Sequence, residues 1–108
     1  MNIQFKKGVL ELCVLSLLEK NNYYGYEIAS TLVKVINISD GTVYPILRRL
    51  KQENYVSSYL EESNEGPPRK YYTLTQKGTD FLEVLKAEWK VFSNQVNRIC
   101  FEGSVSCE

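Results

Sequence analysis

Residues 39–53 have the sequence SDGTVYPILRRLKQE and are predicted to form a helix with one apolar face. The apolar positions recur at i, i+3, i+4 and i+7, and they are Val43, Ile46, Leu47 and Leu50. Ser39 or Asp40 can cap the first turn, and Pro45 is compatible with a helix only near its start. The stretch therefore predicts a helix that begins between Ser39 and Thr42 and is buried along one side.

The opposite face of this helix is polar. At about 100° per residue, Arg48 and Gln52 point away from the apolar stripe, while Tyr44 and Arg49 lie on its flanks. Arginine and glutamine suit guanine and adenine edges in a DNA major groove, whereas Tyr44, Arg49 and Lys51 are better placed for phosphates. Backbone amides and hydroxyls at the helix start can hold a further phosphate, and they belong to Ser39, Gly41 and Thr42. The alternative interpretation is an ordinary solvated helix face.

Two more helices are predicted before this one. Residues 8–20 (GVLELCVLSLLEK) are apolar on nearly every side, so this helix must be covered on more than one face. The Asn21-Asn22 pair predicts a turn, and residues 23–35 then carry apolar side chains at helical spacing along one face. Residues 37–41 form a short connector that is rich in turn and capping residues.

A β-hairpin is predicted after the third helix. Asn54 tolerates the left-handed conformation that ends a helix, and residues 55–60 and 69–74 are rich in aromatic and β-branched residues. The polar, turn-forming residues 61–68 (EESNEGPP) lie between these two strands. Three helices followed by a hairpin is the order of a winged helix-turn-helix domain, in which the hairpin is the wing.

Charged and aromatic residues of the predicted wing also suggest contact with nucleic acid. Arg69, Lys70 and Tyr72 begin the strand that leaves the wing loop, where a winged helix touches the DNA backbone or minor groove. Tyr24 and Tyr26 at the start of the second helix can reach phosphates, or can belong to the core. Phosphate would repel three acidic residues of the wing, Glu61, Glu62 and Glu65. We expect the start of this strand, at Arg69 and Lys70, to contact DNA, and the acidic tip of the wing to face solvent.

The last predicted helix spans residues 76–101 and carries an apolar seam along its whole length. Its members alternate by three and four residues, and they are Leu82, Leu85, Trp89, Phe92, Val96 and Ile99. At about 1.5 Å per residue this helix is roughly 39 Å long, so most of the seam lacks a partner within one chain. We therefore expect a homodimer in which this helix packs against its copy or against the first helix of that copy, through Leu10 and Val14.

Trp89, the single tryptophan, lies in the middle of this seam. Packing at the dimer interface is the simpler role for its ring. The alternative is a wall of a pocket for a small aromatic or hydrophobic effector, because ligand pockets are apolar and favour such junctions.

Composition narrows the functional classes. The chain has 13 basic and 13 acidic residues, so net charge gives no global support for DNA binding. Histidine is absent and the cysteines Cys13, Cys100 and Cys107 are widely spaced, which argues against an enzyme, a metal site, a cofactor or a disulfide framework. A redox role for Cys100 or Cys107 stays open. No apolar run is long enough to cross a membrane, so we expect a cytoplasmic protein.

Several motifs together resemble the PadR-like transcription regulators, in particular short members with a single C-terminal helix. The matching segments cover residues 7–99 and read KGVLELCVLSLL, YYGYEI, ISDGTVYPILRRL, GPPRKYYTLT, QKG and EW. Asn54 departs from the glycine that many relatives have. The resemblance implies a bacterial homodimer that binds a palindromic operator, usually as a repressor, and in multidrug-binding relatives the tryptophan that matches Trp89 stacks on planar ligands.

The resulting expectation is a mainly α (α+β) protein. Residues 1–75 would form a winged helix-turn-helix domain of three helices and a two-stranded wing, and residues 76–108 a dimerisation helix with a short tail. The predicted function is sequence-specific regulation of transcription on double-stranded DNA. The alternative is a winged-helix dimer that binds another protein and no operator.

Overall fold

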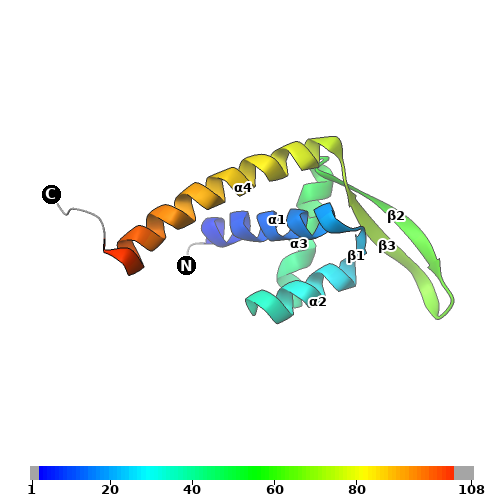
Figure 1. Ribbon diagram of the computed structural model, residues 1–108. Helices are drawn as coiled ribbons and strands as arrows, with labels where there is room; N and C mark the ends of the chain where they lie inside the picture. Colours follow the sequence, from blue (N-terminus) through cyan, green and yellow to red (C-terminus); the bar gives the residue numbers. More distant parts are fainter. Residues whose placement is uncertain (1–2, 104–108) are drawn as a thin grey trace.

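The computed structural model describes residues 3–103, and side chains from Gly8 onward. The elements of this part are α1 (Ile3–Lys20), β1 (Tyr23–Tyr24), α2 (Gly25–Ile36), a short 3-10 turn (Asp40–Thr42), α3 (Val43–Gln52), β2 (Val56–Ser63), β3 (Gly66–Leu74), α4 (Gln76–Asn97) and a π-helical end (Arg98–Glu102). Figure 1 shows α1, α2 and α3 as a compact body, with the β2–β3 hairpin extending from one side and α4 running away on the other. This is the predicted winged helix-turn-helix architecture.

The three helices of the body pack around one core, which also receives residues from the hairpin and from α4. The apolar stripe of α3 is fully buried in this core, as its spacing predicts. Its other buried members are Leu10, Val14, Leu15, Leu18, Ile28, Ala29, Leu32, Ile38, Val56 and Leu82. Along residues 3–103, no helix is both long and apolar enough to span a membrane.

Local sequence explains where α2 and α3 begin and end. Tyr24 precedes α2, and its backbone N–H donates to the Glu27 carboxylate over 3.0 Å. Pro45 is the third residue of α3, where its missing N–H would have no partner within the helix anyway. Asn37 and Asn54 follow the two helices with φ of 62° and 64°, the left-handed conformation that asparagine tolerates. The prediction for Asn54 is confirmed.

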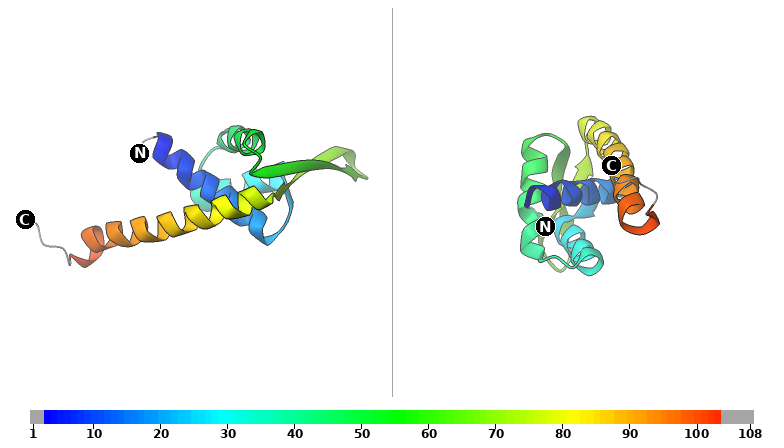
Figure 2. Two further views of the ribbon diagram at one scale, coloured as in Figure 1. Left: turned by 90° about the horizontal axis from the view of Figure 1, so that it is seen from above. Right: turned by 90° about the vertical axis from the view of Figure 1, so that its left-hand side faces the viewer.

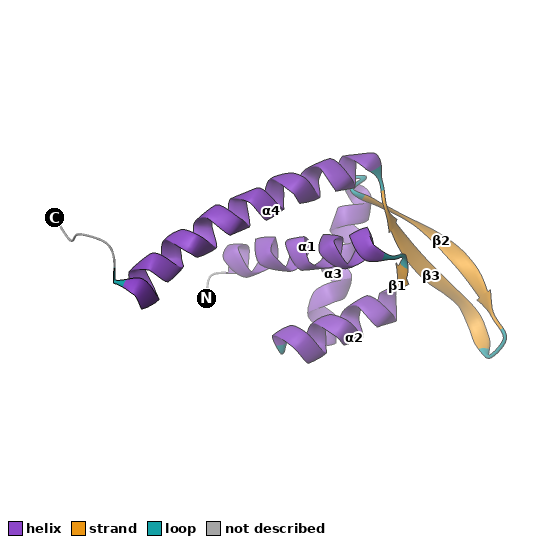
Figure 3. Cartoon of the chain, viewed as in Figure 1, coloured by secondary structure: helices purple, strands orange, loops and turns teal. Residues whose placement is uncertain are grey.

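The wing differs from its prediction in two respects (Figure 3). Its strands are longer than expected, and only Asn64 and Glu65 form the turn between them. The sheet also has a third strand, because β1 pairs with β3 through Tyr23–Tyr72 and Tyr24–Tyr71. This third strand ties the base of the wing to the start of α2.

Pro67 and Pro68 lie inside β3, although their sequence suggested a loop. β1 pairs with β3 only at Tyr71 and Tyr72, so one edge of β3 is unpaired at the prolines. No backbone N–H is needed as a hydrogen-bond donor along that edge. On the other edge, the register with β2 shifts between Glu61 and Ser63, which pair with Arg69 and Gly66 on either side of the prolines. The strand therefore accommodates both prolines.

The end of α3, the start of the wing and the start of α4 meet at Thr75. Its hydroxyl donates to the Asn54 carbonyl over 2.6 Å and accepts the Gly78 amide over 3.0 Å, which caps α4. A Cβ atom at Gly78 would overlap the Tyr55 carbonyl oxygen, so this close approach needs glycine. Lys77 also donates to the Glu53 carbonyl over 2.9 Å. The direction of α4 is thus fixed relative to α3.

Candidate nucleic-acid interface

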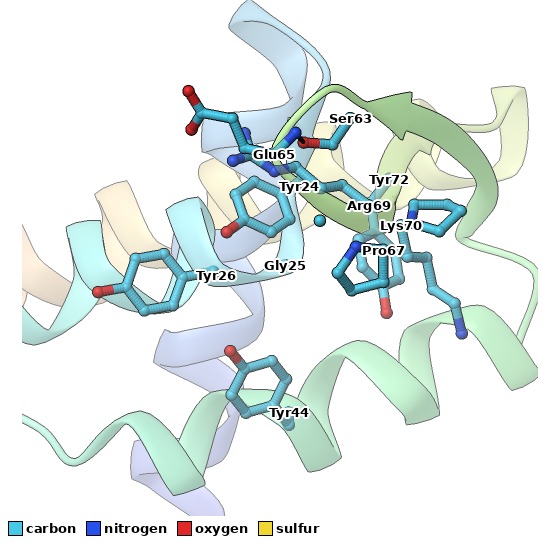
Figure 4. Close-up of a pocket in the computed structure, with 12 residues that line it drawn as sticks. Tyr24, Gly25, Tyr26, Tyr44, Ser63, Glu65, Pro67, Arg69, Lys70 and Tyr72 are labelled. Carbon is cyan, nitrogen blue, oxygen red and sulfur yellow. Dashed lines mark hydrogen bonds between the residues drawn. The ribbon is translucent and has the colours of Figure 1, made fainter.

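A groove lies between the wing and the first turns of α2 and α3 (Figure 4). Its volume is about 470 Å³, and its lining contains both charged and aromatic side chains. The lining residues are Tyr24, Gly25, Tyr26, Tyr44, Ser63, Glu65, Gly66, Pro67, Pro68, Arg69, Lys70 and Tyr72. Six of the residues selected from sequence therefore meet here, namely Tyr24, Tyr26, Tyr44, Arg69, Lys70 and Tyr72.

Tyr24 organises the outer part of this groove. The Arg69 guanidinium lies 5.0 Å from the centre of the Tyr24 ring, a cation–π arrangement that restrains a long side chain. Tyr26 and Tyr71 also contact the Tyr24 ring, with centroids 6.1 Å and 5.8 Å away. Tyr59 stacks on Tyr71 at 5.7 Å. The strand pairing of β1 with β3 brings these residues together, which the sequence did not reveal.

The inner part of the groove is built around Gly25. This residue is buried, and a Cβ atom there would lie 3.5 Å from both the Tyr44 and Tyr72 rings. Burial raises the pKa of the Tyr72 phenol, the nearby Tyr44 hydroxyl adds to the rise, and Arg48 opposes it. Tyr72 is therefore a neutral hydroxyl at physiological pH.

The polar face of α3 is exposed as its spacing predicts, with one exception. Arg48, Lys51 and Gln52 are exposed, and Tyr44 is partly exposed at the groove. Arg49 instead turns toward α1, where its guanidinium forms an ion pair with the Glu11 carboxylate. The charge of Arg49 is thus paired within the chain, and its contact with phosphates stays a prediction.

The residues before α3 lie outside the groove. Gly41 and Thr42 belong to the 3-10 turn and Ser39 precedes it, and the Ser39 and Thr42 hydroxyls are 2.9 Å apart. The Thr42 amide donates to the Ser39 carbonyl over 3.1 Å. Ser39 and Gly41 are exposed, so this end of α3 presents polar groups to solvent next to Tyr44.

The apolar seam of α4 is divided between the core and the surface. Leu10, Val14 and Leu82 were expected at a dimer interface, but they are buried within the single chain and leave almost no surface for a partner. Leu85 is half-buried against the same core. Farther along, Trp89, Phe92 and Val96 of α4 and Ile99 and Phe101 of the π-helical end are 37–83% exposed. In Figure 2 this part of α4 extends beyond the other helices.

Two apolar grooves flank Trp89, and Leu12 of α1 lines both of them. The first has a volume of about 370 Å³ and lies between α1 and α4, with Phe92 and Leu85 in its wall. The second has a volume of about 400 Å³ and extends to Val35 and Ile36 at the end of α2. An ion pair of 2.5 Å between Lys86 and Glu19 links α4 to α1 beside the second groove. Trp89 thus lies at a surface junction of three helices.

The cysteines differ in accessibility. Cys13 is half-buried beside the core, and burial raises the pKa of its thiol, which keeps it protonated and a weak nucleophile. Cys100 is exposed in the π-helical end of the chain. Cys107 lies outside the described residues, so the redox prediction stays open for both of these C-terminal cysteines.

The fold and the groove define the chain as a winged-helix protein of the kind that regulates transcription. A family model described as "Transcriptional regulator PadR-like family" matches residues 14–84. The chain belongs to this family, whose members are transcriptional regulators and not enzymes. The resemblance found in the sequence motifs is therefore confirmed.

Solved structures of relatives agree with the fold. A PadR-like transcriptional regulator from Bacillus cereus is 39% identical, with a TM-score of 0.80, over 91% of this chain and 97% of that chain. A Streptococcus mutans protein is 34% identical, with a TM-score of 0.84 and 94% of each chain covered. Bacillus subtilis PadR, solved in complex with operator DNA, is 28% identical with a TM-score of 0.63, over 69% of this chain and 45% of that chain.

Proposed function

We propose that this PadR-family regulator binds double-stranded DNA as a homodimer and represses transcription at a palindromic operator in the cytoplasm. The carrying observation is the groove in which Arg69 and Lys70 of the wing face Tyr26 of α2 and Tyr44 of α3. Cations and phenols of this kind suit phosphate oxygens. The complex of Bacillus subtilis PadR with operator DNA supports DNA as the partner. Residues 1–75 would form the DNA-binding part and residues 76–108 the dimerisation part.

In this proposal α3 lies in the major groove, and Arg48 and Gln52 contact base edges. The wing strand would lie along the backbone, with Arg69 already restrained by the Tyr24 ring. The other proposed phosphate contacts are Tyr24, Tyr26, Ser39, Gly41, Thr42, Tyr44, Lys51, Lys70 and Tyr72. A neutral Tyr72 can donate a hydrogen bond to phosphate, since burial holds its pKa above the usual value.

Arg48→Ala is expected to weaken operator binding by tenfold or more, on the order of what one bidentate base contact contributes. Binding to random DNA should change much less, because Arg48 would read bases. Lys70→Ala is the matched control, and it should weaken binding to both duplexes alike. Fluorescence anisotropy with the upstream region of the protein's own gene and with a random duplex measures both. An equal loss on the two duplexes for Arg48→Ala would exclude its base-reading role.

The homodimer is supported by the exposed apolar residues in the second half of α4 and in the π-helical end, from Trp89 to Ile99. Two protomers joined through these helices would present their α3 helices about 34 Å apart, one turn of DNA. Operator palindromy would then follow from the two-fold symmetry of the protein.

The proposal includes a response to a small effector. Trp89 is 41% exposed and borders both apolar grooves, so a planar aromatic effector can reach its ring. Because Trp89 is the single tryptophan, a planar cationic dye should quench the intrinsic emission at 295 nm excitation in a saturable way. Quenching that rises linearly with dye and never saturates would leave Trp89 with a packing role alone.

The second candidate is a winged-helix dimer that binds another protein and no operator. Its support is the acidic wing, where Glu61, Glu62 and Glu65 are exposed and Glu65 lines the groove itself. Zero net charge points in the same direction. On this reading, Arg48 and Arg69 variants would bind any duplex as weakly as the unchanged protein does.

A further inference from the structure

The two consecutive arginines of α3 have opposite environments. Arg48 is exposed, whereas Arg49 is half-buried and turned toward α1. The Arg49 guanidinium pairs with the carboxylate of Glu11, a residue that is only 6% exposed. In Figure 1, α1 crosses in front of α3. A buried carboxylate of α1 therefore pairs with a cation of α3.

The environment of Glu11 makes this pair difficult to break. A buried carboxylate is costly without a cation, since the core provides no water to solvate it. Swinging Arg49 out to a DNA phosphate would leave the Glu11 charge unpaired among the apolar residues of α1. The exposed phosphate contact gains less than this because water and salt screen it. We therefore expect Arg49 to stay paired with Glu11 when DNA is bound.

We propose that Glu11 is a specificity-determining residue of the regulator: it withholds Arg49 from the phosphate backbone and fixes the rotation of α3. The proposal rests on the DNA binding proposed above. Phosphate contacts strengthen binding to every sequence alike, so withholding one of them favours the operator over random DNA. Because residues 48 and 49 point about 100° apart, anchoring Arg49 to α1 also directs Arg48 toward the groove side.

The test compares Glu11→Gln with the double variant Glu11→Gln/Arg49→Gln. Glu11→Gln keeps the shape of the side chain but releases Arg49, which can then reach phosphate. We expect its log–log salt dependence on random DNA to be steeper by about 0.9 per protomer, and its affinity to be roughly fivefold tighter per protomer near 0.15 M salt. Selectivity for the operator should fall. The double variant has no cation to release, so its salt dependence should match that of the unchanged protein.

Two results would overturn the inference. One is a Glu11→Gln variant whose salt dependence and selectivity equal those of the unchanged protein. The other is a double variant whose salt dependence is shallower by about 0.9 per protomer, since Arg49 would then already contact phosphate in the unchanged protein. If Glu11→Gln does not fold, the double variant still decides, because its paired amides carry no buried charge. Absence of DNA binding by the unchanged protein would instead reject the proposed function itself.

Discussion

Replacing Arg49 by alanine is expected to lower the free energy of unfolding by about 3 kcal/mol, the low end for a broken buried ion pair. The reason is the partner that stays behind, because Glu11 is buried and would keep its charge with no cation beside it. Arg49 is itself 40% exposed, so water can enter and relieve part of the penalty. Urea unfolding followed by circular dichroism measures the change.

Two control variants separate loss of the pair from loss of a cation. Lys51→Ala removes an exposed cation of the same helix and should change the free energy of unfolding by less than about 0.5 kcal/mol. Glu11→Leu/Arg49→Met removes both charges and should recover most of the loss, since an apolar pair of similar volume replaces a buried ion pair well. A double variant as unstable as Arg49→Ala would contradict the role given to the Glu11 charge.

Introducing two glutamates in the apolar seam, Val96→Glu in α4 with Ile99→Glu in the π-helical end, is expected to convert the proposed dimer into monomers. Both side chains are exposed in the single chain and belong to the apolar seam, so burial in a dimer would place unpaired charges in the interface. Operator affinity should fall on the order of 100-fold or more, because the two half-sites would no longer be bound by one linked unit. Sedimentation equilibrium and anisotropy titration measure the two effects.

Asn94→Glu with Asn97→Glu is the matched control for these charges. Both asparagines are exposed on the same stretch of α4 but lie outside the three-four spacing of the seam. This variant should remain dimeric and bind the operator within about threefold of the unchanged protein, the remaining loss coming from added negative charge. A monomeric control, or a dimeric Val96→Glu/Ile99→Glu variant, would place the interface elsewhere.

Helices were predictable from sequence because their signals are local. The apolar stripe of α3, the position of Pro45 in its first turn and the left-handed Asn54 all depend on residues within a few positions of one another. The order of helices and hairpin then restricted the fold to a winged helix. The structure confirms this part.

Strand pairing was predicted less well, since it depends on residues far apart in the chain. Tyr23 and Tyr24 form a strand only because Tyr71 and Tyr72 lie beside them, and two residues carry no alternation of their own. Pro67 and Pro68 were assigned to a loop because proline has no N–H for pairing with a neighbouring strand. In the structure one edge of β3 has no neighbouring strand at these residues.

The candidate site shows the same limit. Helical projection correctly placed Arg48 on the exposed face. It did not show that Arg49, on the flank, forms an ion pair with Glu11, which lies 38 residues away in the sequence. Spacing identifies Leu82 and Trp89 as members of one apolar seam, but it does not say whether the same chain covers them. The structure assigns Leu82 to the core and leaves Trp89 at the surface.

In the proposed dimer, the junction at Thr75 would couple the packing of the two α4 helices to the spacing of the two α3 helices. Thr75 and Lys77 join α4 directly to the backbone at the end of α3, so the two helices turn as one arm. α4 has 22 residues and is therefore about 33 Å long. A tilt of about 5° between the arms displaces an end by roughly 3 Å, close to the rise of one base pair. A small change in how the two α4 helices pack can thus bring the α3 tips into or out of register with a duplex.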